Sequence, residues 1–544
     1  MLVYKLSDFY KTHFKFILLL LLLGLAFMAW SNRFIQDDAF ISFRYADNFV
    51  QGNGLVWNPG EKVEGYTNFL WTILISIPLY LNLDPVRFSF VLGLILFVLS
   101  LYFTYRLALT LLHSQHLALM AVLLLGTNYS FRSYATGGME TQLQTCLFVA
   151  SLFLLCDSIA KNSWSAFRLL MLSVLLSLAI LTRLDSSLLL GVVLLVTLFH
   201  IFRGQNAGAR KLLMAASLFT PLVLLVGTWL VWKMHFYGSV LPNSFYVKVA
   251  SLTSLKRGVI YVYLFFQSYW LVLFPFLFLV FGNRLRGKAN RQWLILSTTI
   301  MIWLLYVIAV GGDFMEFRFI VPVLPFLLIQ IVWLIFVQVR RTKIQIALLL
   351  MVLAGSLHHE LTFTNPSLRY YDVESTRGLS DLLTQERTDW IGIGKVLGES
   401  FNYDPNITIG ITAAGAIPYY SRLRAIDILG LNDRWVARHG EIVISKPGHQ
   451  RRATLNYLLE RKVNLLIGHP QMIPIGADVS AAPLNDYYFY VKIKKDDQLP
   501  NNSKIIEIPI NASYKLRVLY LVENPLVDEV IQKKGWVTYP FDRE

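Results

Sequence analysis

The chain of 544 residues is 55% hydrophobic and only 15% charged, with a mean hydropathy of +0.52. Ordinary soluble domains carry about 25% charged residues, and this chain contains many apolar runs of 17 or more residues. These values exclude a wholly soluble protein and predict a polytopic α-helical membrane protein. Cys146 and Cys156 lie in one apolar run, where apolar packing is favoured over a disulfide or a metal site.

The net charge of +15 is confined to the first 359 residues, because residues 360–544 hold 22 basic and 22 acidic side chains. A basic excess restricted to the membrane-embedded part of a chain is what the positive-inside rule produces. No RNA- or DNA-binding motif accompanies this charge. The basic balance therefore does not indicate a nucleic-acid partner.

The apolar runs predict eleven membrane spans, at residues 15–31, 86–112, 116–132, 141–159, 166–182, 185–203, 211–233, 259–283, 291–311, 318–338 and 344–358. The first run has no small-residue cleavage site before Arg33, so we expect an uncleaved helix with a cytoplasmic N-terminus. Connectors rich in Lys and Arg then alternate with outer loops. The run 69–83 is shorter than the ~20 residues that a span needs, and we expect an interfacial or re-entrant helix there.

Charged residues become frequent and balanced after Glu360. The patterns NITIGITAAGAIPYY and KVNLLIGHP are typical of strands followed by helices. We therefore expect a membrane domain over residues 1–359, with a first outer loop at 33–85. A soluble α/β or α+β domain over residues 360–544 is expected on the outer, periplasmic face.

The first outer loop contains the adjacent carboxylates Asp37 and Asp38. Ionisable residues at helix ends in a membrane are costly unless paired or solvated, which makes them candidates for a functional site. Either aspartate could instead cap a helix running from about Ala39 to Val50. Aromatic side chains of the same region could stack on sugar rings, although such residues are more often membrane-interface anchors; they are Trp57, Tyr66 and Trp71.

The predicted topology places further polar side chains on the same outer side, namely Arg44, Glu64, Tyr66, Asn68, Glu140, Arg183, Asp185, Asn243, Lys248, Asp313 and Arg318. Several have structural alternatives. Arg183 and Asp185 could tie two helix ends together by a salt bridge, and Asn243 could close a turn. Asp313 could cap a helix, and Arg318 could snorkel to the lipid headgroups. Their convergence on one face predicts a polar cavity open to the outer side.

Such a cavity suits transfer of a sugar from a lipid phosphate. An aspartate within hydrogen-bond reach can serve as general base for the acceptor hydroxyl. Arg, Lys or a carboxylate-held Mg²⁺ can stabilise the phosphate that leaves. A hydrophobic groove between helices can hold the lipid tail.

The order of motifs resembles the GT-C superfamily of lipid-phosphosugar-dependent glycosyltransferases, and within it the terminal β-(1→2) arabinofuranosyltransferase group and its bacterial relatives. The matching segments are DDAFISFRYADNFVQGNGLVWNPGEKVEGYTNFLW, ATGGMET, LTRLDS, YGSVLPNSFYVK, GGDFMEFRFIVPVLP and DILGLNDRWVAR followed by KPGH. They run from residue 37 to about 449, so the resemblance covers most of the chain. The first and fifth segments are long and specific, whereas ATGGMET and LTRLDS are weak individually.

The resemblance implies roles for residues that match these motifs. Asp37 matches the general base, and Asp38 beside it would orient the acceptor or hold a metal. Arg318 is the first choice for the donor phosphate, with Lys248 as a second. The other matches would line the cavity or belong to the outer domain's signature, and they are Arg44, Glu64, Tyr66, Asn68, Asn243, Asp313, Asp427, Asn432, Asp433, Arg434 and His449. No cofactor is assigned, and a divalent cation (Mg²⁺ or Mn²⁺) at Asp37 and Asp38 stays open.

The sequence therefore predicts an inverting glycosyltransferase of the bacterial inner membrane, using a polyprenyl-phosphosugar donor and a glycan or lipid-linked acceptor. A lipid-linked saccharide transporter is the first alternative, but such proteins usually show inverted repeats, and we find no internal symmetry. A polymerase or ligase using lipid-diphosphate oligosaccharides is the second alternative. The sugar, the acceptor and the oligomeric state are not assigned.

Overall fold

The computed structural model describes residues 2–203, 208–247, 252–281, 291–362, 372–443, 445, 448–477, 490–493, 499–500 and 503–541. The chain forms two compact units that do not follow chain order. Unit 1 comprises Met1–Phe34, Val86–Val231 and Ser251–Ser375. Unit 2 comprises Ile35–Pro85, Trp232–Ala250 and Thr376–Glu544. The first outer loop and part of the fourth therefore fold with the C-terminal region.

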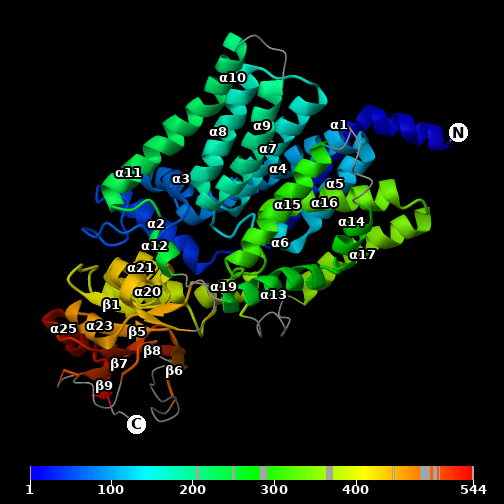
Figure 1. Cartoon of the computed structure of the whole chain (residues 1–544). Coiled ribbons are helices and arrows are strands. Elements are labelled where there is room, and N and C mark those ends of the chain that lie inside the picture. Colours follow the sequence, from blue (N-terminus) through cyan, green and yellow to red (C-terminus); the bar gives the residue numbers. More distant parts are fainter. Residues whose placement is uncertain are drawn as a thin grey trace. The chain divides into compact units, whose positions relative to one another are not determined.

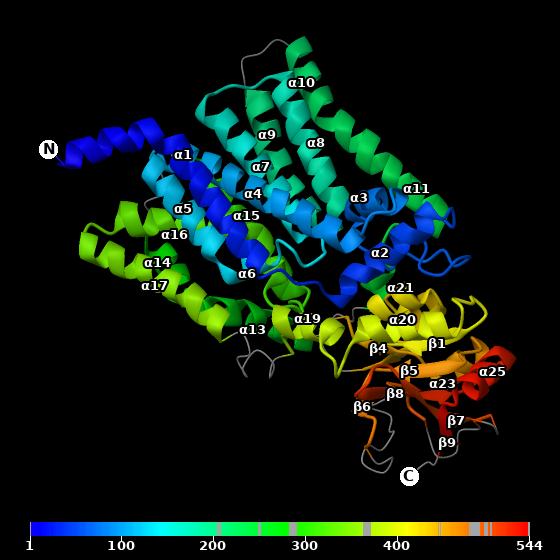
Figure 2. The same ribbon diagram turned by 180° about the vertical axis from the view of Figure 1, so that it is seen from behind.

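Unit 1 is helical throughout its described residues, apart from short connections (Figures 1 and 2). Its helices are α1 (Leu2–Ser31), α4 (Pro85–Leu112), α5 (Gln115–Thr127), α6 (Tyr129–Ser133), α7 (Thr141–Ala160), α8 (Ala166–Thr182), α9 (Ser187–Arg203), α10 (Gly208–Pro221), α13 (Leu252–Ser268), α14 (Leu273–Phe281), α15 (Arg291–Ala309), α16 (Leu324–Trp333) and α17 (Thr342–Leu361). α8 packs against both α7 and α10, and these helices run side by side in both views.

Eight helical segments of the described residues are long and apolar enough to cross a membrane, which confirms a multi-pass protein. They are Phe14–Ser31, Pro85–Leu112, Thr141–Ala160, Leu184–Arg203, Gly208–Tyr237, Arg291–Ala309, Arg318–Phe336 and Thr342–Leu361. Gly208–Tyr237 joins α10 to α11 (Thr228–Tyr237) through a π-helical stretch, η2 (Leu222–Gly227). Pro221 directly precedes this stretch and removes a backbone donor from the helical ladder.

Two predicted spans are interrupted by residues that are not helical. The predicted span 116–132 is α5, of 13 residues, followed by α6, because Asn128 ends the first helix and caps the second by accepting from Phe131 N (3.1 Å). The predicted span 166–182, by contrast, coincides with the single helix α8, of 17 residues. The predicted span 259–283 is divided into α13 and α14, where Trp270 adopts a left-handed φ of 57°. Pro275 lies in the first turn of α14 and cannot donate to an upstream carbonyl.

The run 69–83 forms α3 (Phe69–Tyr80), a helix of 12 residues. At 1.5 Å per residue its length is about 18 Å, well short of the ~30 Å hydrocarbon core of a bilayer. Its placement as an interfacial or re-entrant helix stays a prediction. Within unit 2 it packs against α2 (Asp37–Val50).

The C-terminal part of unit 2 is a mixed sheet with helices, as expected for an α/β or α+β region. The strands are β1 (Thr408–Ile411), β2 (Arg424–Asp427), β5 (Leu465–Gly468), β6 (Met472–Pro474), β7 (Lys504–Pro509), β8 (Tyr514–Tyr520) and β9 (Val537–Pro540), in the order β2-β1-β5-β8-β7-β9 with β6 on β8. β3 (Glu441–Ile442) and β4 (Arg451–Arg452) form a separate pair. The helices are α12 (Asn243–Val247), α19 (Thr376–Thr384), α20 (Trp390–Ser400), α21 (Ala416–Ser421), α22 (Arg434–His439), α23 (Leu455–Glu460) and α25 (Pro525–Lys534).

β1 pairs in parallel with both β2 and β5, whereas the remaining partners are antiparallel. Every residue of β1 and β5 is buried, which explains their largely apolar composition, because parallel strands are covered on both faces. The pattern NITIGITAAGAIPYY is confirmed as a strand followed by a helix, β1 and α21. The prediction for KVNLLIGHP is half wrong, because β5 is followed by strand β6.

Arg44 of α2 joins the first outer loop to the C-terminal sheet region. Its guanidinium donates to the carbonyls of Trp57 (2.7 Å), Leu423 (2.8 Å) and Pro418, and to Asn58 Oδ1 (3.1 Å). It also lies 4.9 Å from the centre of the Trp57 ring. Four of its five N–H groups thus bond protein oxygens, so we interpret Arg44 as a scaffold residue rather than a substrate contact.

Arg44→Met is expected to lower the free energy of unfolding by about 3 kcal/mol, because buried carbonyls lose a charged donor. Thermal unfolding of the purified protein measures this loss. Arg422→Met is the matched control: Arg422 is exposed and sits 3.8 Å from Asp47, so its loss is expected to cost less than about 0.5 kcal/mol. Equal effects of the two substitutions would contradict the scaffold role.

Candidate functional site

Asp37 and Asp38 are the first two residues of α2, and neither caps that helix. The N-cap is Gln36, without a side-chain cap. The capping alternative for α2 is therefore wrong. Instead, the Asp37 carboxylate accepts hydrogen bonds from the backbone N–H groups of Gly415 (3.0 Å) and Ala416 (2.7 Å), where α21 begins. The two bonds fix the orientation of this carboxylate.

Burial raises the pKa of Asp37 from 3.8 to about 7, although the Ala416 amide lowers it; Asp38 adds a further increase. A carboxyl group with this pKa is divided between its acid and base forms near neutral pH. It can therefore accept a proton from a hydroxyl and release it again without a large free-energy difference.

Gly415 makes this arrangement possible because a side chain would not fit there. A Cβ atom at Gly415 would lie 1.9 Å from the Asp37 carbonyl oxygen and 2.8 Å from its carboxylate carbon. The glycine therefore permits the close approach of α2 to the start of α21.

Glu64 forms a buried ion pair with Lys233 (2.9 Å), in which both side chains are at most 4% exposed. Burial raises the pKa of Glu64 to about 7, and Lys233 opposes this rise. The sequence analysis missed Lys233. The signal was present, since a single lysine near the end of an otherwise apolar helix needs a partner.

Asn243 connects three motifs that lie far apart in the chain. Its side chain donates to the carbonyls of Gly430 (2.8 Å), Leu431 (3.1 Å) and Asp433 (3.0 Å). Its backbone N–H donates to the Glu64 carbonyl (2.8 Å). Asn243 thus does more than close its own turn, because it holds the loop after β2 against the first outer loop.

Asp427 organises the loop after β2. Its oxygens accept from the N–H groups of Leu429 (3.0 Å), Gly430 (3.1 Å) and Asn432 (2.8 Å). Burial raises its pKa to about 6, and the bonds from Asn432 lower it. This fully buried carboxylate therefore orders a turn.

The other signature residues also have structural partners. Asp433 caps α22 by accepting from Val436 N (3.0 Å) and also accepts from the Tyr457 hydroxyl (2.8 Å). Arg434 donates to the carbonyls of Lys62 (3.0 Å) and Tyr237 (2.5 Å). His449 is partly buried, and Lys248 lies outside the described residues.

Tyr66 and Asn68 are buried in the packing of the first outer loop. The Tyr66 hydroxyl lies 3.1 Å from that of Tyr237, and Asn68 bonds Ser42 of α2 (3.1 Å). Trp57 and Trp71 are at most 1% exposed and Tyr66 is 3% exposed. The expectation that these three rings stack on sugars is wrong, because they are core residues.

The remaining candidates form a second group, within unit 1. Arg183 pairs with Glu140 (2.9 Å) and Asp185 (2.8 Å), so the salt-bridge alternative is confirmed. Gln144 (2.8 Å) and Tyr306 (3.1 Å), which the sequence analysis did not select, also donate to Asp185. The pairing satisfies these buried charges at the ends of α7 and α8.

Arg318 belongs to the same group. Its Nε donates to Asp313 (2.6 Å), and one of its terminal nitrogens lies 3.4 Å from the sulfur of Met139. The guanidinium carbons of Arg318 and Arg183 lie 5.1 and 5.2 Å from the centre of the Phe319 ring. Asp313 thus pairs with Arg318, and the structure gives it no helix-capping bond.

No group of three or more His, Cys, Asp or Glu side chains among the described residues is arranged to hold a metal ion. Asp37 and Asp38 alone provide two carboxylates, and both Asp37 oxygens accept backbone N–H groups. These residues do not fit a preformed Mg²⁺ or Mn²⁺ site, which usually needs octahedral oxygen coordination.

Lys233→Met is expected to make stability depend more strongly on pH than in the wild type. The variant removes the cation that opposes the rise in the pKa of Glu64, so the folded pKa moves above the value of about 7 that it has beside Lys233. The range over which stability falls as pH rises then extends from about 5 to above 7. At pH 8 we expect a loss of about 3–5 kcal/mol. Thermal unfolding at pH 6 and pH 8 measures both effects.

The matched control is the double variant Glu64→Gln/Lys233→Met, which removes both charges. Its stability should vary less with pH than that of Lys233→Met, and it should be the more stable of the two at pH 8. Equal stability of Lys233→Met and the double variant at pH 8 would show that the Lys233→Met loss does not come from an unpaired Glu64 carboxylate.

Comparison with known proteins gives relatives in both sequence and fold. A family described as a domain of unknown function (DUF8728) matches residues 380–518. The terminal β-(1→2)-arabinofuranosyltransferase of Mycobacterium tuberculosis is 27% identical over 252 residues, or 44% of this chain and 39% of that protein. The Corynebacterium glutamicum protein of the same name is 42% identical over 48 residues, or 9% of this chain and 7% of that protein. The matched regions therefore span well under half of these relatives.

Two solved structures share the fold. ArnT from Cupriavidus metallidurans bound to undecaprenyl phosphate has a TM-score of 0.56 and 13% identity, covering 95% of this chain and 99% of that chain. Its apo state has a TM-score of 0.52 and 13% identity, covering 94% and 98%. The predicted fold class is confirmed. The chain has the GT-C fold of ArnT, and its sequence is related to that of the terminal β-(1→2)-arabinofuranosyltransferases.

Proposed function

We propose that this protein is a glycosyltransferase that moves a sugar from a polyprenyl-phosphate donor to a hydroxyl of a glycan or lipid-linked acceptor. The observation that carries the proposal is Asp37, an oriented carboxylate with a pKa of about 7. The ArnT fold, which occurs in a protein that binds undecaprenyl phosphate, supports the donor class. The arabinofuranosyltransferase relative supports a pentose as the sugar, with a hexose as the alternative.

In the proposed reaction Asp37 removes the proton of the acceptor hydroxyl as its oxygen attacks the anomeric carbon of the donor. The bond between that carbon and the phosphate oxygen breaks, and the polyprenyl phosphate leaves with the electron pair. Attack from the face opposite the leaving group inverts the anomeric configuration. The two amides on Asp37 hold the carboxylate in place during the transfer.

Arg318 is the proposed partner of the donor phosphate. Arg318 is the first residue of the segment Arg318–Val323, which follows α15. Its hydrogen bond to Asp313 fixes the plane of its guanidinium. A planar guanidinium suits the oxygen atoms of a phosphate and stabilises the charge that develops on the leaving group. Asp38 would orient the acceptor, and Lys248 is a second candidate for the phosphate.

We place the protein in the bacterial inner membrane, with its N-terminus in the cytoplasm and the residues from 360 onward in the periplasm. The distribution of Lys and Arg among the connectors supports this orientation. The acceptor is then a component of the cell envelope, available at the outer face.

Asp37→Asn tests the base directly. The amide cannot take up the proton, so transfer by purified protein is expected to fall by about 10²–10⁴-fold. In the wild type, kcat/KM should rise with pH and level off above about pH 7, because the carboxylate is the active form. Assays with a polyprenyl-phosphosugar donor across pH 5–9 measure both. A wild-type rate in Asp37→Asn would remove Asp37 as the base.

Gly415→Ala tests the positioning of Asp37 without changing the carboxylate. The added Cβ would meet the Asp37 carbonyl and displace the base, and a 1 Å displacement costs about 100-fold in rate. Gly476→Ala is the control, since its Cβ would meet nothing within 4 Å. Activity should fall in the first variant only, with both proteins monodisperse after purification.

A further inference from the structure

The connection between α6 and α7 carries a buried hydroxyl that the proposed mechanism does not use. Tyr134 is 2% exposed, and its hydroxyl has no hydrogen-bond partner among the described residues. Ser133 Oγ and Gln142 Oε1, close in the chain, are also buried without a partner there. Buried polar groups are nearly always bonded, so each exception needs an explanation.

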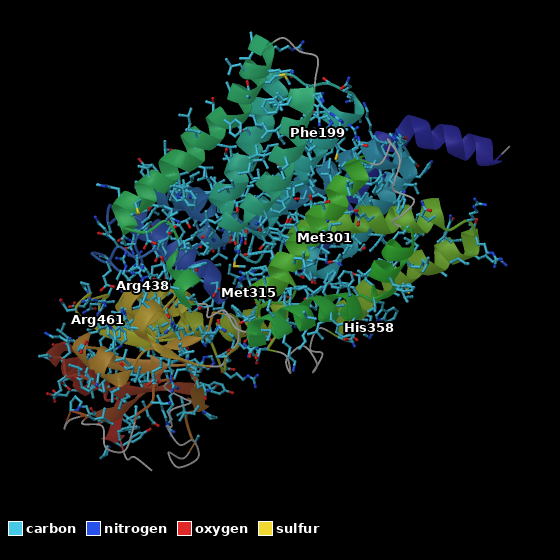
Figure 3. The ribbon with its side chains drawn as sticks, in the orientation of Figure 1. Phe199, Met301, Met315, His358, Arg438 and Arg461 are labelled. Atoms are coloured by element: carbon cyan, nitrogen blue, oxygen red, sulfur yellow. The ribbon has the colours of Figure 1, made fainter. Side chains whose placement is uncertain are left out.

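Other buried tyrosines of unit 1 do not share this property. The Tyr269 hydroxyl bonds Ser130 (2.7 Å), that of Tyr261 donates to the Met315 carbonyl (3.0 Å), and that of Tyr306 donates to Asp185 (3.1 Å). Met315 is labelled in Figure 3. The packing of unit 1 thus provides hydrogen-bond partners for the hydroxyls of these three tyrosines, whereas the hydroxyl of Tyr134 has none among the described residues.

Tyr134 lies near the group that contains Arg318. It directly follows α6, and α6 packs against the short helix η5 (Arg318–Val323), whose first residue is Arg318. Five residues later, Met139 contacts the Arg318 guanidinium (3.4 Å). The connection that begins at Tyr134 therefore contacts Arg318 through Met139, and the helix before it packs against the element that Arg318 begins.

The Tyr134 hydroxyl is available as a donor at all physiological pH values. Burial raises its pKa well above 10, the nearby Tyr261 and Glu316 add to this, and Arg318 opposes it. A protonated hydroxyl can donate one hydrogen bond, and it does so without adding a charge. That chemistry suits a phosphate oxygen whose charge is already balanced by an arginine.

We propose that the Tyr134 hydroxyl donates a hydrogen bond to the phosphate of the polyprenyl-phosphate donor, beside Arg318. This assignment rests on the proposed function. It adds Tyr134, an uncharged positioning residue, to Arg318, the charged residue proposed to bind the same phosphate. It accounts for the orphaned hydroxyl, because the partner arrives with the substrate. It also accounts for the location of the hydroxyl in the connection that contacts Arg318.

The test compares full-length wild type, Tyr134→Phe and Tyr269→Phe, each purified in the same detergent. Binding of undecaprenyl phosphate, undecaprenol and inorganic phosphate is measured by titration, and Tm is measured without ligand. Tyr134→Phe is expected to bind undecaprenyl phosphate about tenfold more weakly, as expected for one lost bond to a charged group. Its affinity for undecaprenol should be unchanged, and its Tm equal to or above that of the wild type.

Tyr269→Phe is the matched control, because it removes a hydroxyl that bonds only protein. It should lower Tm and leave the affinity for undecaprenyl phosphate unchanged. Equal affinity of Tyr134→Phe and wild type for undecaprenyl phosphate, or a lowered Tm of Tyr134→Phe, would overturn the inference while the proposed function stands.

Two other outcomes distinguish a failure of the Tyr134 assignment from a failure of the proposed polyprenyl-phosphate donor. If the wild type does not bind undecaprenyl phosphate, the proposed donor class fails and the assignment of Tyr134 fails with it. If the wild type binds only inorganic phosphate, with the same dependence on Tyr134, the site takes a free anion and the lipid headgroup is wrong.

Discussion

The docking of α2 along α21 is the interaction on which unit 2 depends. Two side chains of α2, seven residues apart, contact opposite ends of the short helix α21. Asp37 accepts from the N–H groups at its start, and Arg44 donates to the Pro418 and Leu423 carbonyls near its end. The negative side chain thus meets the positive end of the helix dipole, and the positive side chain meets the negative end. Because Asp37 is one of the two contacts, the candidate base is positioned by the same pairing that holds the fold together.

Charge pairing in buried surroundings explains the positions of six other candidate residues, Glu64, Glu140, Arg183, Asp185, Asp313 and Arg318. Arg183 is matched by two carboxylates, Lys233 by Glu64, and Arg318 by Asp313. Arg461, labelled in Figure 3, pairs with Glu61 within unit 2, although both of these side chains are partly exposed. A buried charge without a partner would cost several kcal/mol, so each group is fixed in position by its partner. Fixed charges of this kind need little rearrangement when a reaction develops charge beside them.

The sequence was sufficient for the fold class and for most helices, because apolar runs of span length are strong local signals. The sequence was insufficient to predict the helix boundaries that depend on a single residue. Asn128 and Trp270 end helices inside apolar runs that look continuous. The partner of Asp37 lies 378 residues away at Gly415, and no local pattern carries that information. Lys233 was overlooked because it was counted within a predicted span, and the aromatic rings of the first outer loop could not be recognised as core residues without their packing.

The discontinuous composition of unit 2 has a consequence for the synthesis of this protein. Its first stretch, Ile35–Pro85, is complete about 290 residues before Thr376 is added to the chain. At about 5–20 residues per second, the interval is on the order of tens of seconds. Throughout that interval Arg44 has no Leu423 carbonyl to bond, and Asp37 is a solvated carboxylate of ordinary acidity. The Asp37 carboxylate therefore lacks its two amide partners until Gly415 and Ala416 have been synthesised, and the proposed base acquires its raised pKa only when the C-terminal part of the polypeptide has folded against it.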